Sequence, residues 1–381
     1  ANTLMMNRTY VFEASYNSRL TSILRAINLE PVLFLSITLL SLVGLGILYS
    51  AGDASIELVQ KQGLRLGLAF MVMVIVAQIS QQQLYVWTPW FFVLGIVLLL
   101  LVLIMGDVGK GAQRWLDLYV IRFQPSEMMK LAVPMMVAWY IADVRLPPNR
   151  WQLLAGGIMI AIPMLMIARQ PDLGTALLIA SAGFFVLFLA GLQWRLLGFL
   201  SVITAAAAPL IWHFMHDYQR QRVITFLDPE QDPLGAGYHI IQSKIAVGSG
   251  LLSGKGFLQG TQVHLNFLPE RHTDFAFSVW AEEWGFIGSI FFLACYIFLI
   301  LLALKIAGSA RDKFGVLLCF GIVSLLFWQA FINLGMLLGL LPVVGMPLPF
   351  FSYGGSSLLT TLIGLGILFN IGMRRHMTFT S

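Results

Sequence analysis

The chain of 381 residues is 58% hydrophobic and only 11% charged, with a mean hydropathy of +0.83. Soluble domains carry about 25% charged residues, so this composition predicts a polytopic membrane protein. The net charge of +5 is modest, and no Lys/Arg cluster interleaved with aromatic residues indicates nucleic-acid binding. Cys295 and Cys319 both lie in apolar runs, which argues against a structural disulfide.

Apolar runs suited to cross a bilayer follow one another along the chain, at about 20 residues per membrane helix. Residues 1–28 lack the apolar core of a cleavable signal peptide, so the first run is expected to be a retained anchor. The fourth run, 131–142, is long enough only if it includes part of the preceding FQPSEMMK. Polar interruptions split the two longest runs into two spans each. The ten expected spans lie in 31–50, 66–106, 131–142, 151–168, 173–194, 196–216, 284–304 and 314–373.

The predicted fold is therefore an all-α polytopic membrane protein with ten transmembrane helices and both termini in the cytoplasm. Eleven of the 23 Lys and Arg residues then lie inside, and five of the others lie in a long outer loop that has little influence on orientation. The four segments of unusual chemistry all fall on the outer face: 107–130, 169–175, 217–283 and 339–357. The predicted organisation is a cytoplasmic segment 1–30, a membrane domain 31–375 with a large extracytoplasmic loop 217–275 between the seventh and eighth helices, and a cytoplasmic tail 376–381.

The connection before the fourth span carries charges close to the membrane. Pro125 suits the first turn of a helix, which places Glu127 and Lys130 three residues apart on one helix face. These two side chains are expected either to form a local ion pair or to line a polar cavity inside the bundle. Upstream, Arg114 beside Trp115 suits an anionic or sugar-bearing ligand.

Two further outer segments hold candidate ligand-binding groups. Asp172 either caps the sixth span or joins a network with Lys130 or Arg114. IAVGSGLLSGKG has the wrong spacing for an ATP-binding loop, but its backbone amides and Lys255 are candidates to hold a lipid phosphate. YHIIQSKIAV is amphipathic enough to lie along the interface, with Lys244 reaching toward headgroups.

LPERHTDFAFSVWAEEWGFIG is the most unusual stretch, because a charged loop runs directly into an apolar helix. The spacing predicts that Asp274 and Glu282 share one helix face, about 12 Å apart. Asp274 either caps this helix, with Thr273 as a competing cap, or serves as a catalytic carboxylate. Arg271, His272 and the basic loop around them favour a catalytic carboxylate above a pocket for an anion. No zinc-ligand spacing and no GxSxG motif occurs.

These segments resemble those of the SEDS (shape, elongation, division and sporulation) family of bacterial membrane proteins. The resemblance spans residues 109–357 in the family's order, and the ten-span layout covers the rest. FLPERHTDF followed by PLPFFSYGGSS is hard to reach by chance. The other matching segments are GAQRWL, FQPSEMMKL, QPDLGTA, YQRQRVITFLDPEQDPLGAGYHIIQSKIAVGSG and AEEWGFIG.

The resemblance implies a peptidoglycan glycosyltransferase of the bacterial cytoplasmic membrane, which polymerises lipid II on the outer face during cell elongation. Asp274 matches the family's essential aspartate and would take the proton from the acceptor sugar's 4-hydroxyl as general base. No cofactor is certain, although a divalent cation, Mg²⁺ or Mn²⁺, could share the pyrophosphate. The implied partner is a class B penicillin-binding protein that crosslinks the new strands within the elongation complex.

The pyrophosphate leaving group of lipid II requires positive charge nearby, for which the candidates are Arg114, Lys130, Lys255 and Arg271. The residues expected to contact substrate are Arg114, Trp115, Glu127, Lys130, Asp172, Lys244, Lys255, Arg271, His272, Thr273 and Glu282. A lipid II flippase is the alternative function, since midspan charges suit a transporter. The polar groups crowd one face, however, and no inverted repeat with paired broken helices is evident. A non-catalytic scaffold would leave the residues around Asp274 without a purpose.

Overall fold

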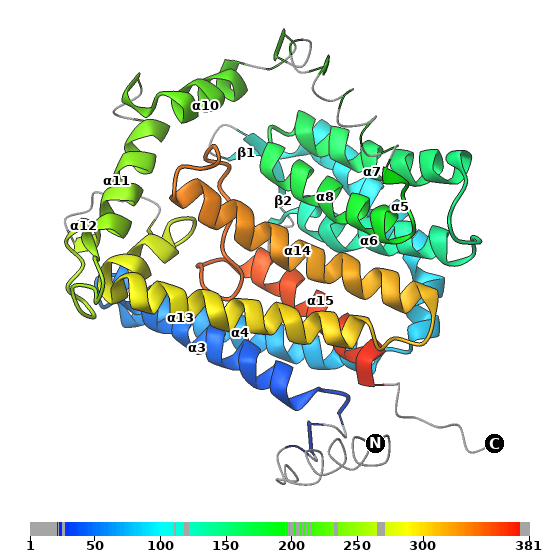
Figure 1. The fold of residues 1–381 in the computed structure, drawn as a ribbon, viewed down its shortest axis with the longest axis horizontal. Coiled ribbons are helices and arrows are strands. Elements are labelled where there is room, and N and C mark those ends of the chain that lie inside the picture. Colours follow the sequence, from blue (N-terminus) through cyan, green and yellow to red (C-terminus); the bar gives the residue numbers. More distant parts are fainter. Residues whose placement is uncertain are drawn as a thin grey trace, which may run out of the picture.

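The structure is a computed structural model, and it describes residues 27–109, 112–117, 122–194, 217–231, 235–264 and 271–373, with a few more between 21 and 24 and between 196 and 215. Long helices dominate these residues (Figure 1). They are α3 (Pro31–Ala51), α4 (Ile56–Gln78), α5 (Gln81–Met105), α6 (Pro125–Ala142), α7 (Arg150–Arg169), α8 (Leu173–Leu189), α13 (Ala276–Ala307), α14 (Lys313–Leu337) and α15 (Gly355–Met373).

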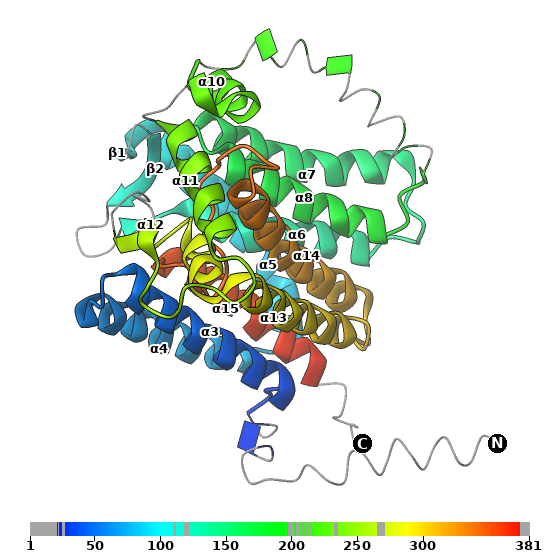
Figure 2. The same ribbon diagram turned by 60° about the vertical axis from the view of Figure 1, so that its left-hand side comes forward.

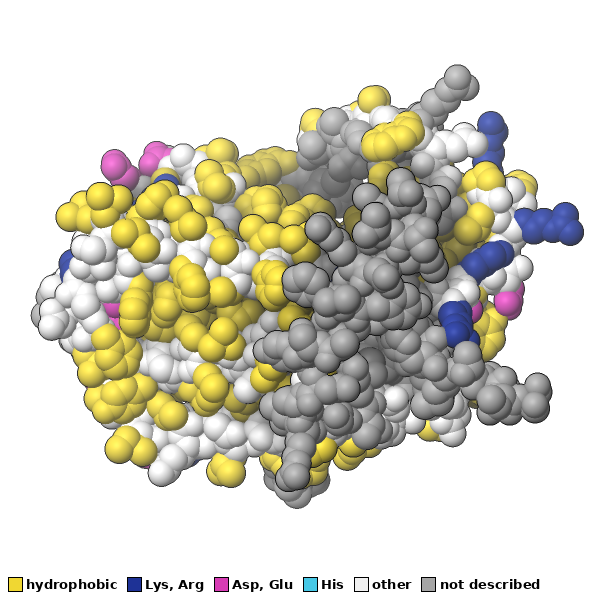
Figure 3. All heavy atoms as spheres, turned by 60° about the horizontal axis from the view of Figure 1, so that its bottom comes forward, with side chains coloured by type: hydrophobic (Ala, Val, Ile, Leu, Met, Phe, Trp, Pro, Cys, Tyr) yellow, Lys and Arg dark blue, Asp and Glu magenta, His cyan; other side chains and the backbone are white. Residues whose placement is uncertain are grey.

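Seven of these helices are long and apolar enough to cross a membrane, namely α3, α4, α5, α7, α13, α14 and α15. α8 is apolar but has 17 residues, and α6 begins at Pro125, so it includes part of FQPSEMMK, namely PSEMMK, as predicted. The expected span 196–216 falls largely outside the described residues. Hydrophobic side chains cover a broad field of the surface in Figure 3, as expected of a protein that faces lipid.

α4 and α13 extend beyond the uncharged runs from which they were predicted. α4 begins at Ile56 rather than at residue 66, so its first turns carry Glu57 and Lys61, which form an exposed ion pair at 2.5 Å. α13 begins at Ala276 rather than at 284 and includes two buried glutamates, Glu282 and Glu283. The prediction ended each span at a charged residue, but these helices continue through charged residues that are paired or buried.

The bundle has α3 and α4 on one side and α7 and α8 on the other, with α6, α14 and α15 between them (Figures 1 and 2). α14 packs against α6, α8, α13 and α15, so apolar residues cover its whole circumference. α15 lies along α4. The start of α3 and the end of α15 lie at one end of the bundle, opposite to α11 and α12 (Figure 1).

The shorter elements belong to the connections. Between α5 and α6 lies an antiparallel sheet of β1 (Asp107–Gly109), β2 (Ala112–Asp117) and β3 (Arg122–Phe123), in which Leu116 pairs with Phe123. Before α13 come α10 (Asp217–Leu227), the 3-10 helix η1 (Pro229–Gln231), α11 (Ala236–Ser249) and α12 (Thr261–His264). α11 packs against α13 and α14.

A break in α13 at Gly285 (φ 64°, ψ −160°) is filled by the loop that follows α11. The carbonyls of Glu282 and Glu283 accept hydrogen bonds from the amides of Lys255 and Gly256, both at 3.0 Å. Beyond the break, the amides of Phe286 and Ile287 donate to the carbonyls of residues 251 and 252, at 2.8 and 3.1 Å. We call these four bonds the α13 lock. They satisfy backbone groups that a helix break would leave bare in an apolar environment.

The α13 lock corrects one prediction. The amides of Lys255 and Gly256 were expected to be exposed and available to a lipid phosphate. They are instead committed to the carbonyls of α13.

Candidate functional site

Asp274 lies in the turn before α13 and not in the helix itself. The helix starts after Phe275 (φ −106°, ψ 17°), which occupies the N-cap position in place of Asp274 or Thr273. The amide of Ser278 bonds to the Phe275 carbonyl, which leaves the Asp274 carbonyl to accept from Asn333 Nδ2 at 2.9 Å. The prediction that Asp274 and Glu282 share a helix face is therefore wrong, and so is the capping interpretation of Asp274 and Thr273.

The connection between α14 and α15, residues 338–354, lies against this turn. Gly345 (φ 70°) is so close that a Cβ on it would stand 3.3 Å from Asp274 Oδ2. On the other side, a Cβ on Gly174 at the start of α8 would stand 3.1 Å from Val344 Cβ and 2.9 Å from Met346 Cε. Residues 344–346 are therefore packed between the Asp274 turn and the start of α8.

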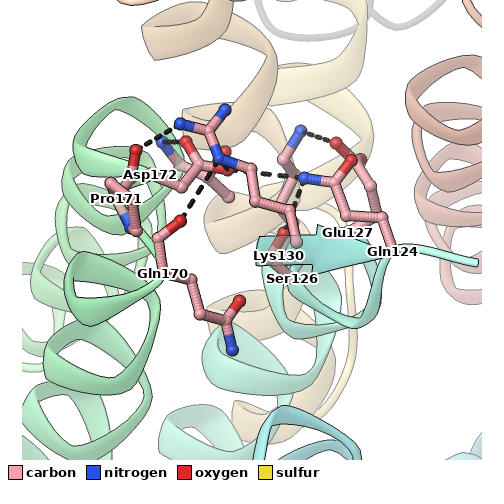
Figure 4. A network of polar contacts seen from close by, with 9 residues as sticks. Gln124, Ser126, Glu127, Lys130, Gln170, Pro171 and Asp172 are labelled. Carbon is pink, nitrogen blue, oxygen red and sulfur yellow. Dashed lines mark hydrogen bonds and ion pairs between the residues drawn. The ribbon is translucent and has the colours of Figure 1, made fainter. Parts of the chain in front are cut away.

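Arg114 of β2 holds the turn between α7 and α8 (Figure 4). Its Nε donates to the Gln170 carbonyl at 3.3 Å and lies 4.0 Å from the Asp172 carboxylate, and its terminal nitrogen donates to the Pro171 carbonyl. Asp172 Oδ1 also accepts from the Thr175 amide at 3.2 Å. Asp172 thus caps α8 and belongs to a network with Arg114, so both interpretations from the sequence hold.

Glu127 and Lys130 form the predicted ion pair on α6, at 2.7 Å (Figure 4). Both side chains are more than 90% buried. Lys130 also lines a small cavity of about 20 Å³ between α6, α14 and α15, whose lining is mainly apolar. Gln124 joins the first turn of α6 to the α8 cap, since its amide donates to Ser126 Oγ at 3.0 Å and to Asp172 at 3.4 Å.

Glu282 anchors the loop that fills the break in α13. Its Oε1 accepts from Lys255 Nζ at 2.6 Å, from Thr261 Oγ1 at 3.0 Å and from the Gln262 amide at 3.1 Å. The Glu282 side chain is fully buried, whereas that of Lys255 is 27% exposed. In this structure the two residues tie the loop to the helix rather than facing an open pocket.

The remaining sequence-predicted residues occupy the same end of the molecule. Arg271 is buried and bonds to Asp53, in the turn after α3, at 2.5 Å. His272 and Thr273 are half-buried, and the His272 carbonyl accepts from the Tyr353 amide at 2.8 Å. Trp115 is half-buried in β2.

Lys244 is exposed on α11 and has no acidic partner within the described residues. It lies beside Gly339, where a Cβ would stand 2.1 Å from its Cε. Among all residues that the structure describes, no three His, Cys, Asp or Glu side chains lie close enough to share a metal ion.

Two residues that hold the Asp274 turn were not identified from the sequence. Asn333 is fully buried in α14, where its amide donates to the carbonyls of Asp274 and Met346. Gly345 provides the close approach to the carboxylate. An amide within an apolar span was the available signal for Asn333, because polar groups at membrane depth need a partner.

Removing the positive charge at position 255 is expected to destabilise the fold. Lys255→Met leaves the Glu282 carboxylate buried without its cation. We expect a loss of roughly 2 kcal/mol, less than for a fully buried pair because Lys255 is partly exposed. Thermal unfolding in detergent measures the change. Lys61→Met is the matched control, since it removes an ion pair of similar length whose side chains are 56% and 74% exposed, and it should change little. Equal midpoints for the two variants would contradict an anchoring role for Lys255.

Fold and site together define a multi-pass membrane protein with a polar site at one end of its helix bundle. A family model described as "Cell cycle protein", for FtsW, RodA and SpoVE, matches residues 26–377. The chain belongs to this family.

Two relatives are similar in sequence to this chain along nearly its whole length. A "Peptidoglycan glycosyltransferase MrdB" of Escherichia coli K12 is 48% identical over 352 residues, which cover 92% of this chain and 95% of the relative. A "Probable peptidoglycan glycosyltransferase FtsW" of Geobacter metallireducens is 36% identical, with 92% and 96% covered.

Solved structures share the fold. The rod shape determining protein RodA of Thermus thermophilus superimposes with a TM-score of 0.69 at 28% identity, covering 92% of this chain and 98% of that one. A chain from a peptidoglycan synthase complex that coordinates polymerization and crosslinking superimposes with a TM-score of 0.80 at 31% identity, covering 92% of this chain and 99% of that one.

Proposed function

We propose that Asp274 is the general base of a lipid II polymerase acting during cell elongation. The activity of the chain, peptidoglycan glycosyltransferase, is that of its 48% identical relative. In the proposed reaction, the acceptor sugar's 4-oxygen forms a bond to the donor's anomeric carbon as the bond to pyrophosphate breaks. The proton of the 4-hydroxyl passes to Asp274.

The observation that carries this assignment is how Asp274 is held. Its carboxylate is half-buried beside Gly345, and its turn is fixed through backbone carbonyls by α14 and by the connection 338–354. A general base must be held within hydrogen-bond reach of the proton that it removes. The hydrogen bonds that hold the turn go to the backbone carbonyls of His272 and Asp274.

The basic side chains near the site differ in whether a carboxylate already pairs with them. Arg114, Lys130, Lys255 and Arg271 each already face a carboxylate, at 4.0, 2.7, 2.6 and 2.5 Å respectively. Lys244 faces none within the described residues. We therefore assign Lys244 the contact with the pyrophosphate, and the other four a mainly positioning role.

Ten spans with both termini in the cytoplasm are part of the proposal, as is the bacterial inner membrane. Nine long helices are described, yet the start of α3 and the end of α15 lie at the same end of the bundle (Figure 1). An odd number of crossings would put them at opposite ends. We propose a tenth crossing between α8 and α10, where 196–216 was predicted, which would bring both termini to one side. The site then lies on the extracytoplasmic face, as the Lys/Arg distribution favours.

The proposed partner is a class B penicillin-binding protein that crosslinks the glycan product. A similar chain comes from a synthase complex that couples polymerization to crosslinking. This chain covers 99% of that chain, so the part of it that meets its complex partners has a counterpart here.

The test is polymerisation of labelled lipid II by the purified protein with this partner, whose crosslinking is blocked. Glycan ladders are the expected result. If an intact complex makes no ladder but moves lipid II across proteoliposome membranes, the polymerase assignment is wrong and the flippase alternative replaces it.

Lys244→Gln is expected to lower kcat/KM for lipid II about tenfold. A charge-assisted hydrogen bond contributes about 1.5–3 kcal/mol, and exposure to solvent weakens it toward the lower value. Initial polymerisation rates at varied lipid II concentration measure the effect. Lys305→Gln removes the same charge from the last turn of α13, at the opposite end, and should keep the wild-type value. If both variants behave alike, Lys244 does not contact the pyrophosphate.

A further inference from the structure

We infer that Asn333 is a positioning residue for the Asp274 carboxylate, an inference that rests on the proposed function. Asn333 lies one turn before the end of α14, is fully buried and is not part of any segment that the sequence analysis singled out. Its Nδ2 donates to the Asp274 carbonyl at 2.9 Å and to the Met346 carbonyl at 2.6 Å. One amide thus joins two segments that are far apart in the sequence.

Both amide hydrogens are needed for this bridge, and only one orientation of the side chain provides them. Turning the amide would place its oxygen against two carbonyl oxygens, which repel it. Asn333 Oδ1 is buried and has no hydrogen-bond partner. A buried acceptor without a partner costs free energy, so this side chain is retained for what its nitrogen holds.

The two bonded carbonyls belong to the two segments that meet at the carboxylate. One belongs to Asp274 itself, and the other belongs to Met346, next to Gly345, whose Cα faces Asp274 Oδ2. The bridge therefore fixes the distance between the carboxylate and the backbone that it faces. A second tether to the same connection, from the Tyr353 amide to the His272 carbonyl, acts two residues upstream of Asp274. An error of about 1 Å in the position of a catalytic group can cost about 100-fold in rate.

Asn370 of α15 offers a chemically matched control. It is also fully buried, its Nδ2 also bridges two backbone carbonyls, those of Ala77 and Ile79, and its Oδ1 also has no partner. It joins α15 to the end of α4 and has no bond to the Asp274 turn. Loss of either amide should affect stability to a similar degree, whereas only loss of Asn333 should displace the carboxylate.

The experiment compares Asn333→Leu with Asn370→Leu, because leucine keeps the size of the side chain and removes the donors. Each variant is purified with the crosslinking partner, and kcat and KM for lipid II are measured alongside the thermal midpoint. We expect Asn333→Leu to lower kcat by 10- to 100-fold with KM within about twofold of wild type. Asn370→Leu should lower the midpoint by a similar amount and keep kcat near wild type.

Equal kcat for the two variants would overturn the inference. The proposed function would still stand in that case, provided that the wild-type protein makes glycan ladders. A rise in KM without a fall in kcat would also overturn it, since Asn333 would then affect binding instead of the position of the base. If Asn333→Leu is too unstable to purify, Asn333→Ser takes its place. Its smaller side chain cannot bridge both carbonyls, and the same loss in kcat is expected.

Discussion

Asp274→Asn is expected to stop glycan polymerisation, with a fall in rate of about 10² to 10⁴-fold. The substitution keeps the size of the side chain and removes its ability to accept a proton, which is the contribution expected of a general base. The fold should survive, because the turn is held through the carbonyls of His272 and Asp274 and not through the carboxylate alone.

The measurement is the rate of ladder formation from labelled lipid II, with the thermal midpoint and the yield of the partner complex as checks on folding. Asp312→Asn is the matched control. Asp312 caps α14 by accepting from the Gly315 amide at 3.0 Å, and asparagine caps a helix as well as aspartate does. Ladders from Asp274→Asn at the wild-type rate would exclude it as the base and move the search to Glu127, Asp172 and Glu282.

The membrane helices could be predicted because the bilayer sets the length and polarity of each span. Pro125 at the start of α6 and the pairing of Glu127 with Lys130 were also predictable, since both depend on neighbours three residues apart. The starts of α4 and α13 were predicted too late. A charge can lie inside a span when a partner on another segment pairs with it, and Lys255 does this for Glu282.

The geometry around Asp274 depends on contacts between distant segments and could not be predicted from local spacing. The helical repeat of residues 274, 278 and 282 suggested one helix face, but the bond from Asn333 keeps Asp274 out of the helix. The Gly-rich loop after α11 likewise looked available to a phosphate until the break at Gly285 gave its amides carbonyl partners. In both cases a backbone carbonyl on another segment decided the outcome.

Gly254→Ala is expected to disrupt the α13 lock and to cost roughly 3 kcal/mol or more of stability. Gly254 has φ 78°, and a Cβ on it would stand 2.1 Å from the Glu283 carbonyl oxygen and 2.4 Å from its carbon. Strain at this φ and overpacking each cost about 1–3 kcal/mol. The backbone on both sides is rigid, so it cannot move away from the added Cβ without a large cost in free energy. Gly285→Ala meets the same obstacle from the other side, since its Cβ would stand 2.3 Å from the Gly254 amide nitrogen.

Thermal unfolding in detergent tests this, with Gly248→Ala as the control. Gly248 lies in α11 with open space around it, so alanine there should stabilise the helix by about 0.5–1 kcal/mol. The two Gly→Ala changes lie six residues apart and should shift the thermal midpoint in opposite directions. Such a result would show that the loss at Gly254 comes from close backbone contact and not from helix propensity. Because the lock ties the loop after α11 to α13, Gly254→Ala should also lower polymerisation. Unchanged stability and activity would mean that the loop does not occupy the break in α13.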